Sequence, residues 1–247
     1  MNKLLAQSFI NANNLKVILD PCGSSPFPQQ AIWKAQHICV AEDFSKATLP
    51  AESKCGQIIV QHQLKVAHYS VLEHAFVRFD CQGFNHDTVM QLRTHSASSM
   101  LVQSGRYTSK RFIAVADGEL PVETTFWFKP IGEYTNREGK KYEITQDLID
   151  ERKLICYKAC IDYEHEISMG VAEEDARNCL PQNIKQAFCL AANIKDLFHV
   201  IDQRSLSDAQ IECQVWSYMV IQLLLEWCPE IAAWYFTNRY TRARLAP

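Results

Sequence analysis

The sequence predicts an α+β fold in a single domain across all 247 residues, with a twisted, mostly antiparallel sheet flanked by long helices and a helical C-terminal half. Between Glu73 and Gly83 apolar residues alternate with mostly polar ones, which is typical of a strand with one side facing solvent. After Gly139 the spacing of apolar residues becomes helical almost to the end of the chain. The composition, 47% apolar and 21% charged, is that of a globular protein with a substantial core. We place that core at about 27–235 and expect 239–247 to be a loose tail.

The first half of the chain is expected to mix helices and strands. Helical spacing of apolar residues predicts helices at 29–40 and 56–66. Asn85 offers an N-cap for a further helix, which is expected to end at about His95. The other elements expected before residue 139 are a serine-rich loop and two strands, at 96–103, 104–115 and 123–129.

The second half is expected to consist mainly of helices. Gly170 closes a helix over 142–169, and Leu180-Pro181 ends a shorter one over 172–179. Ser207 and Gln210 match the capping-box pattern, so a third helix is expected to begin there. Its body, 215–225, is apolar on nearly every side, which predicts burial in the core or between subunits.

Charge and hydropathy exclude several classes of protein. Lys and Arg total 25 against 28 for Asp and Glu, so the formal charge is −3 and non-specific nucleic-acid binding is not expected. The most apolar segment, 218–227, is far shorter than the roughly 20 residues of a membrane span. The first 17 residues lack the basic-then-apolar order of a secretory signal. We therefore expect no membrane partner.

The ten cysteines predict free thiols in a reducing cytoplasm. None forms a C-x-x-C pair, and most lie in apolar surroundings, where a thiol packs as a small hydrophobic group. Cys156 and Cys160 are four apart on an expected helix, but no second pair completes a zinc site.

The densest polar stretch, 91–107, crosses from a helix end through a serine-rich loop. Arg93, His95, Arg106 and several serines supply donors suited to oxyanions, and a loop of small residues exposes backbone amides. This stretch indicates an anionic ligand. The alternative is a solvated loop with scattered charges.

Two further groups carry polar side chains. His68, Glu73 and His74 suggest a metal at first, but the five-residue step from His68 to Glu73 matches no standard ligand spacing, so we expect no metal. Hydrogen bonds at a strand start are the alternative. Farther on, Arg177 and Arg204 offer planar forks that suit phosphate or a pyrimidine carbonyl edge, although each alone is also typical of a surface. A short amphipathic turn at 193–199 lies between them and directs Asn193, Lys195 and His199 outward. The sequence has no G-x-G-x-x-G, P-loop, G-x-S-x-G or H-E-x-x-H motif.

Together these stretches resemble the flavin-dependent thymidylate synthases. That family's His-x-Ser-x-x-Glu-His segment stands here intact at 68–74. Its Arg-His-Arg triplet aligns with Thr94-His95-Ser96, and the serine and arginine that follow it align with Ser104 and Arg106. The remaining matches, in order along the chain, are Ala176-Arg177 with Leu180-Pro181, Asn193 to His199, and Arg204 with Ala209-Gln210-Ile211-Glu212.

The resemblance implies an enzyme that methylates the uracil ring of dUMP reductively at C5 to give dTMP. Methylenetetrahydrofolate supplies the carbon, NADPH the hydride, and bound FAD mediates both. The family forms homotetramers whose active sites draw on several subunits, and it uses no cysteine nucleophile.

The resemblance also implies roles for individual residues. The dUMP ligands would be Gln91, Arg93, Gln103, Ser104, Gly105, Arg106, Arg177 and Arg204. Arg106 and Arg177 would hold the phosphate, and Arg204 would stabilise charge on the uracil edge, so these three guanidinium groups are expected to converge on one nucleotide. Arg204 and Ser104 are the candidate catalytic residues, Ser104 as a positioning ligand. FAD would be held by Ser70, Glu73, Thr94, His95, Ser96, Asn193, Lys195 and His199, with His68 on the folate and NADPH side.

Thr94 and Ser96 replace both arginines of the family triplet, and Lys195 replaces another arginine. Arg93 stands one residue before the triplet and offers a partial substitute. Each charged hydrogen bond left unreplaced weakens FAD binding by about 1–3 kcal/mol. Two alternatives therefore stay open: a relative that methylates another pyrimidine nucleotide such as UMP, and a catalytically silent nucleotide or flavin binder.

Overall fold

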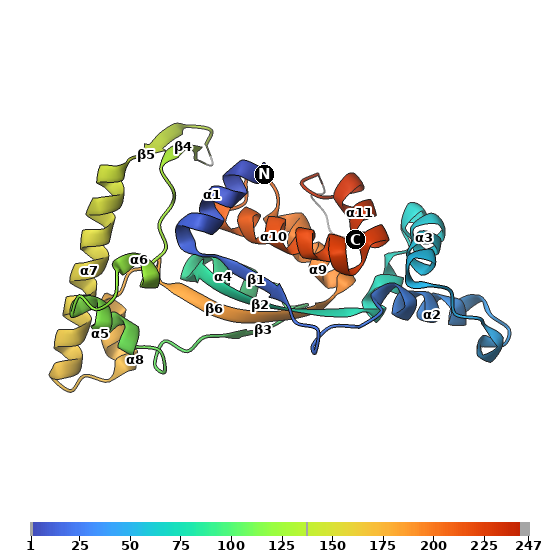
Figure 1. Cartoon of the computed structure of the whole chain (residues 1–247), viewed down its shortest axis with the longest axis horizontal. Coiled ribbons are helices and arrows are strands. Elements are labelled where there is room, and N and C mark those ends of the chain that lie inside the picture. The colour runs from blue at the N-terminus through green and yellow to red at the C-terminus, as the bar shows by residue number, and fades with distance from the viewer. Residues whose placement is uncertain (1, 137, 243–247) are drawn as a thin grey trace.

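The computed structural model describes residues 2–136 and 138–242, and it has the α+β fold that the sequence predicts (Figure 1). The strands are β1 (Lys16–Leu19), β2 (Phe76–Asn85), β3 (Ser99–Val102), β4 (Gly132–Thr135), β5 (Lys141–Ile144) and β6 (Lys185–Asn193). The helices are α1 (Lys3–Asn13), α2 (Pro28–Val40), α3 (Glu52–His62), α4 (His86–Arg93), α5 (Lys110–Ala116), α6 (Val122–Thr125), α7 (Gln146–Ser168), α8 (Glu173–Ala176), α9 (Ile194–Arg204), α10 (Ile211–Trp227) and α11 (Pro229–Asn238). Short 3₁₀ turns include η3 (Tyr69–His74) and η4 (Arg177–Cys179).

The main sheet has four strands in the order β1-β2-β6-β3, and every pairing in it is antiparallel. β2 and β6 form its centre, paired from Phe76 opposite Asn193 to Asn85 opposite Lys185. Successive side chains of a strand point to opposite faces, so Val77 and Phe79 are buried while Phe76 is exposed. β4 and β5 form a separate two-stranded hairpin.

Helices cover one face of this sheet and leave the other open. In Figure 1, α1, α4, α9 and α10 lie on the same side of the strands. On the opposite face, Leu101 is 77% exposed, and Ile18 and Phe76 are each 58% exposed. Exposed apolar side chains from three different strands are a feature of surfaces that contact another protein molecule.

The main core packs β2 and β6 against α9, α10 and α11. α10 is buried along one side through Val215, Trp216 and Leu224, but several residues on its other side are only half-buried, so burial all round its axis is not observed in one chain. A second, smaller core joins α5 to α7 around Phe112 and Tyr163.

Two predicted strands are wrong. Segment 104–115 is a turn followed by α5, in which Phe112 and Val115 are buried three residues apart, a spacing that fits a helix face. Segment 123–129 contains the end of α6 and a single bridge from Phe126 to Ile184. The expected loop at 96–103 in turn contains β3, which pairs with β6.

The helical second half also differs from expectation. β6, the central strand, lies within it, and so does β5, where Tyr142 pairs with Tyr134. α7 therefore begins only at Gln146, with the side chain of Thr145 as its N-cap. α10 begins at Ile211 without a side-chain cap, so the predicted capping box is wrong.

The amphipathic turn expected at 193–199 is the start of the longer helix α9, whose N-cap is Asn193. The expected loose tail begins later than residue 239, because Arg239 pairs with buried Asp202 at 2.8 Å. Residues 243–247 of that tail lie outside the described part of the chain.

Candidate functional site

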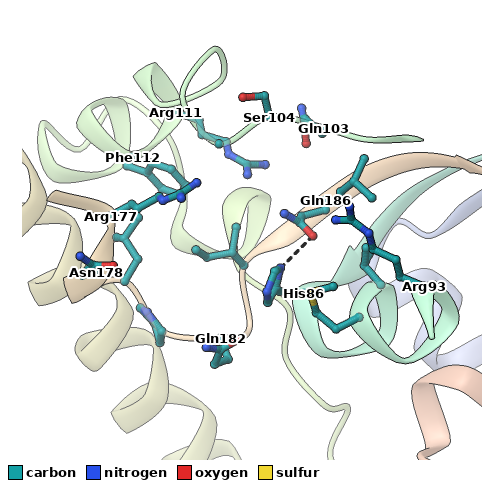
Figure 2. Close-up of a pocket in the computed structure, with 17 residues that line it drawn as sticks. His86, Arg93, Gln103, Ser104, Arg111, Phe112, Arg177, Asn178, Gln182 and Gln186 are labelled. Carbon is teal, nitrogen blue, oxygen red and sulfur yellow. Dashed lines mark hydrogen bonds between the residues drawn. The ribbon is translucent and has the colours of Figure 1, made fainter. Parts of the chain in front are cut away.

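A cavity of about 470 Å³ lies between α4, the segment after β3, α5 and the segment around η4 (Figure 2). Its polar lining residues are His86, Arg93, Gln103, Ser104, Arg111, Arg177, Asn178, Gln182 and Gln186. Among the described residues that line it there are three arginines and no carboxylate. This charge balance suits an anionic ligand.

The backbone that follows β3 brings the predicted nucleotide ligands to this cavity. The N–H of Gln103 donates to the Ala187 carbonyl at 2.8 Å, and the N–H of Ala187 donates to Oε1 of Gln103 at 3.2 Å. These two bonds extend the pairing with β6 and place Ser104 and Gly105 at the cavity edge. A Cβ atom at Gly105 would lie 3.9 Å from Nη1 of Arg177, so this guanidinium group lies directly beside the glycine backbone.

Arg106 stands in the same turn but does not line the cavity. Its side chain is exposed, and its carbonyl accepts a 3.0 Å hydrogen bond from Ser109. Tyr107 beside it is 86% exposed. The turn therefore presents both side chains outward from the single chain.

Arg204 lies elsewhere, held by a dense set of hydrogen bonds at the C-terminal end of α4. Its Nε donates to Nε2 of His95 at 3.0 Å and its Nη1 donates to Oε1 of Gln91 at 3.2 Å. Its Nη2 donates to the Gln91 carbonyl at 3.0 Å and to Oγ1 of Thr94 at 3.1 Å. Gln91 is fixed in turn by a 2.6 Å bond from its Nε2 to Oε1 of Gln210. The guanidinium group of Arg204 is thus anchored in one orientation.

His95 is suited to this network only when it is neutral. Burial lowers its pKa to about 4, and the positive charge of Arg204 and the nearby His199 add to the effect. A neutral imidazole with its proton on Nδ1 leaves Nε2 free to accept from Arg204. The imidazole and guanidinium groups therefore orient each other.

The two groups of predicted dUMP ligands lie on different faces of α4. His86, Val89 and Arg93 face the 470 Å³ cavity, whereas Gln91 faces Arg204. Arg204 lines a second hollow of about 420 Å³ together with Gln91, Gln203, Asp208, Ala209 and Gln210. One chain therefore does not bring Arg204 into the cavity that Arg177 lines, and the expected convergence of guanidinium groups is not observed within a single chain.

Three of the predicted FAD ligands lie on α9 or at its N-cap, and two of these contact others from η3 and from the segment after α4. Lys195 and His199 are one turn apart, and the His199 ring lies 5.8 Å from that of His95. Nζ of Lys195 pairs with Oε1 of Glu73 at 2.5 Å, which joins α9 to η3. The side chain of Asn193 accepts from the N–H of Asp196 at 2.9 Å as the N-cap of α9. Ser70, Thr94 and Ser96 are exposed, as is His68.

The ammonium group of Lys195 and the exposed hydroxyls of Ser70 and Ser96 are donors of the kind that bind a flavin pyrophosphate, and the Glu73 carboxylate already pairs with the ammonium group. Thr94, in place of a triplet arginine, donates to the Gln91 carbonyl at 2.7 Å and accepts from Arg204. Its hydroxyl is therefore committed within the chain. The described residues form one wall for a cofactor and do not enclose it.

Sequence reasoning missed Arg111, His86 and Gln186 as residues of the cavity. Nδ1 of His86 and Oε1 of Gln186 are 3.1 Å apart and join α4 to β6 (Figure 2). Arg111 was missed because segment 104–115 was expected to be a strand and because Arg111 belongs to none of the motifs that carry the family resemblance. The signal that could have placed Arg111 on a helix is the helical spacing of the apolar residues Phe112 and Val115 that follow it.

No helix in 2–136 or 138–242 is long and apolar enough to cross a membrane. Within the same ranges, no three His, Cys, Asp or Glu side chains gather in a way that could hold a metal ion.

Comparison with known proteins identifies the class. The family model described as thymidylate synthase complementing protein matches residues 23–230, so the chain belongs to this family of flavin-dependent thymidylate synthases, which are methyltransferase enzymes. The resemblance seen in the sequence is thereby confirmed. The flavin-dependent thymidylate synthase of Haloarcula marismortui is 30% identical over 200 residues, covering 77% of this chain and 80% of the relative. That of Halobacterium salinarum is 29% identical over 204 residues, covering 79% and 81%.

Solved structures share the fold. The UMP/dUMP methylase PolB from Streptomyces cacaoi, bound with 5-Br dUMP, has a TM-score of 0.76 at 19% identity and covers 94% of this chain and 97% of its own. Thymidylate synthase X from Helicobacter pylori, solved with FAD and dUMP, has a TM-score of 0.67 at 16% identity and covers 88% and 96%.

Proposed function

We propose that the protein methylates dUMP reductively at C5 to give dTMP, with bound FAD, methylenetetrahydrofolate as carbon donor and NADPH as hydride source. The observation that carries this proposal is the presence of two polar sites on different faces of α4. One is a cavity with arginines and no carboxylate among its described lining residues, and the other is an arginine locked in orientation by Gln91, Thr94 and His95. The family relationship supports the reaction type.

The nucleotide phosphate lies in the arginine cavity. Arg177 neutralises it, while Ser104 and Gly105 position it with a hydroxyl and a backbone amide. Arg106 adds a second positive charge when its exposed side chain turns from solvent toward the phosphate. Arg204 contacts the uracil edge. A guanidinium group has five N–H donors, and four bonds to α4 and the residues after it leave one N–H on Nη1 for a uracil carbonyl. That donor stabilises the negative charge that develops on the ring oxygen when C5 becomes nucleophilic.

Bound FAD supplies the redox capacity that neither the nucleotide nor any side chain has. Thr94, His95 and Ser96 would contact it from the end of α4, and Asn193, Lys195 and His199 from α9. Ser70 and Glu73 would complete this wall from η3, and His68 would face the folate and nicotinamide.

We also propose that the working form is a homotetramer whose active sites are shared between subunits. Two observations support it. Arg204 and Arg177 line different hollows beside α4, so one nucleotide can contact both arginines only if they come from different chains. The open sheet face with Leu101 supplies an apolar surface for the contact. The ten free cysteines, most of them buried or half-buried, support a place in the reducing cytoplasm.

The test is formation of dTMP from dUMP with FAD, NADPH and methylenetetrahydrofolate. Arg204→Ala should lower turnover by about 100-fold or more, because one donor to a developing charge is lost, while the purified protein stays folded and yellow. Arg242→Ala, an exposed arginine, is the matched control. Wild-type turnover in Arg204→Ala would discard the role of Arg204.

Nucleotide preference is measured with the same protein. Adding dUMP should shift the flavin spectrum strongly, and adding UMP should do so poorly. Comparable shifts with both nucleotides would instead favour a methylase of a wider range of pyrimidine nucleotides. A protein that binds neither flavin nor nucleotide would refute the proposed function.

A further inference from the structure

We propose that Arg111 is a binding residue for the phosphate of the nucleotide, acting with Arg177 from a different wall of the same cavity. This inference rests on the proposed function and assigns a ligand contact to a residue outside the motifs of the family resemblance. Arg111 lies on α5, whereas Arg177 opens η4. Figure 2 shows both guanidinium groups directed toward the middle of the cavity.

Arg111 is held rigidly in this position. Its Nη1 donates to the Lys185 carbonyl on β6 at 2.7 Å, and its guanidinium carbon lies 4.9 Å from the centre of the Phe112 ring. The ring supports one face of the planar group. Little side-chain entropy is left to lose when a ligand binds, which increases the net free energy of a contact.

The donors of Arg111 are largely unused. Its Nε is buried and has no hydrogen-bond partner among the described residues. A buried N–H without a partner costs free energy that an acceptor in the cavity would restore. Phosphate oxygens fit this need, because a guanidinium fork binds them through two parallel hydrogen bonds.

The excess of positive charge around Arg111 also favours binding of an anion. Lys185 beside it is buried, and its Nζ donates to the Glu123 carbonyl at 2.6 Å, which is a neutral acceptor. The Glu123 carboxylate pairs with Lys153 at 3.3 Å. Within the described residues, neither Arg111 nor Lys185 has a carboxylate within ion-pair distance. Burial lowers the pKa of both groups, that of Lys185 to about 8, and the negative charge of Glu123 offsets this effect only in part at Lys185.

Arg111 differs in burial from the other arginines of the cavity. Arg93 and Arg177 are exposed, and Nε of Arg177 donates to the Glu174 carbonyl at 3.2 Å. Arg111 is half-buried, so water screens its attraction for a phosphate less. We therefore expect it to contribute as much to phosphate affinity as Arg177.

The experiment measures equilibrium binding of dUMP, deoxyuridine and inorganic phosphate to the FAD-loaded protein. Arg111→Gln should raise the Kd for dUMP about 10- to 100-fold, as expected for a lost hydrogen bond to a charged group. It should weaken phosphate binding too, and it should leave the weak binding of deoxyuridine unchanged. Arg111→Lys keeps the charge without the fork and should fall between the two proteins.

Lys110→Gln is the matched control, because it removes one positive charge from the adjacent, exposed position on α5. It should bind all three probes like the wild type. Circular dichroism and gel filtration check that the variants fold. Should Arg111→Gln fail to fold, Arg111→Lys carries the test with the same probes.

Two results would overturn the proposal. One is unchanged dUMP affinity in a folded Arg111 variant while Arg177→Gln binds weakly. The other is an equal loss for dUMP and deoxyuridine, which would indicate a structural role for Arg111. A wild type that binds inorganic phosphate through Arg111 but does not bind dUMP would support the anion contact and refute the proposed function.

Discussion

At the scale of single residues, the arrangement of Arg204 and His95 explains why residues 109 positions apart depend on each other. The imidazole accepts from the guanidinium only in its neutral form, and burial together with the charge of Arg204 favours that form. Protonation would break the hydrogen bond and place two cations in contact. The orientation of Arg204 therefore depends on pH.

Protonation of His95 should lower the free energy of unfolding in acid. Its folded pKa, about 4, lies below the usual value of 6.5, so the unfolded chain binds a proton first as pH falls. Its contribution to stability is present above pH 6.5 and is lost progressively toward pH 4. His95→Gln retains an acceptor for Arg204 and should give a flatter dependence of Tm on pH between 4 and 6.5. Parallel profiles for the two proteins would contradict this.

Several site residues could be found from sequence because motif spacing marks them, and the structure brings Gln91, Thr94, His95 and Arg204 into contact. Arg111 could not be found in this way. Its role depends on the fold of its own segment and on the carbonyl that β6 presents to it. The helical spacing of Phe112 and Val115 indicates the first, but the carbonyl on β6 comes into reach only through tertiary folding.

At the scale of elements, α9 begins at Ile194, directly after its N-cap Asn193, and carries Lys195, His199 and Arg204. Asn193 was predicted to be a flavin ligand, and it is also the N-cap of this helix. Its two roles can be separated by substitution.

Asn193→Ala should lower the free energy of unfolding by about 1 kcal/mol, because the N–H of Asp196 loses its acceptor. Asn193→Ser keeps an N-cap oxygen and should stay near wild-type stability. Urea unfolding measures both. FAD affinity that falls equally in the two variants would show that Asn193 contacts the cofactor, and wild-type stability in Asn193→Ala would refute the cap.

The elements that the sequence predicted well are those with strong local patterns, such as the alternation in β2 and the N-cap of α4 at Asn85. β6 was not predicted because its stability comes from pairing with β2 and β3, which both lie far earlier in the chain. The four-residue strands β1 and β3 are too short to show a period. Pairing with distant strands, and not a local pattern, makes these three segments strands.

At the scale of the whole molecule, the exposed side of the sheet should bury its apolar residues against another subunit. Leu101→Glu places a charge on this face and should lower the mass measured by sedimentation, with loss of dTMP formation. Leu4→Glu, on α1 where Leu4 is 83% exposed, is the matched control and should keep the assembly. An unchanged mass for Leu101→Glu would exclude this face from the contact.

The central claim is that Arg177 of one subunit and Arg204 of another serve the same nucleotide. The most direct test co-expresses Arg177→Ala and Arg204→Ala chains with different tags, purifies the mixed oligomers and measures dTMP formation. Each variant alone should be inactive, whereas equal random mixing should restore about a quarter of the sites, those that receive both arginines. Mixed oligomers as inactive as the separate variants would contradict a shared site.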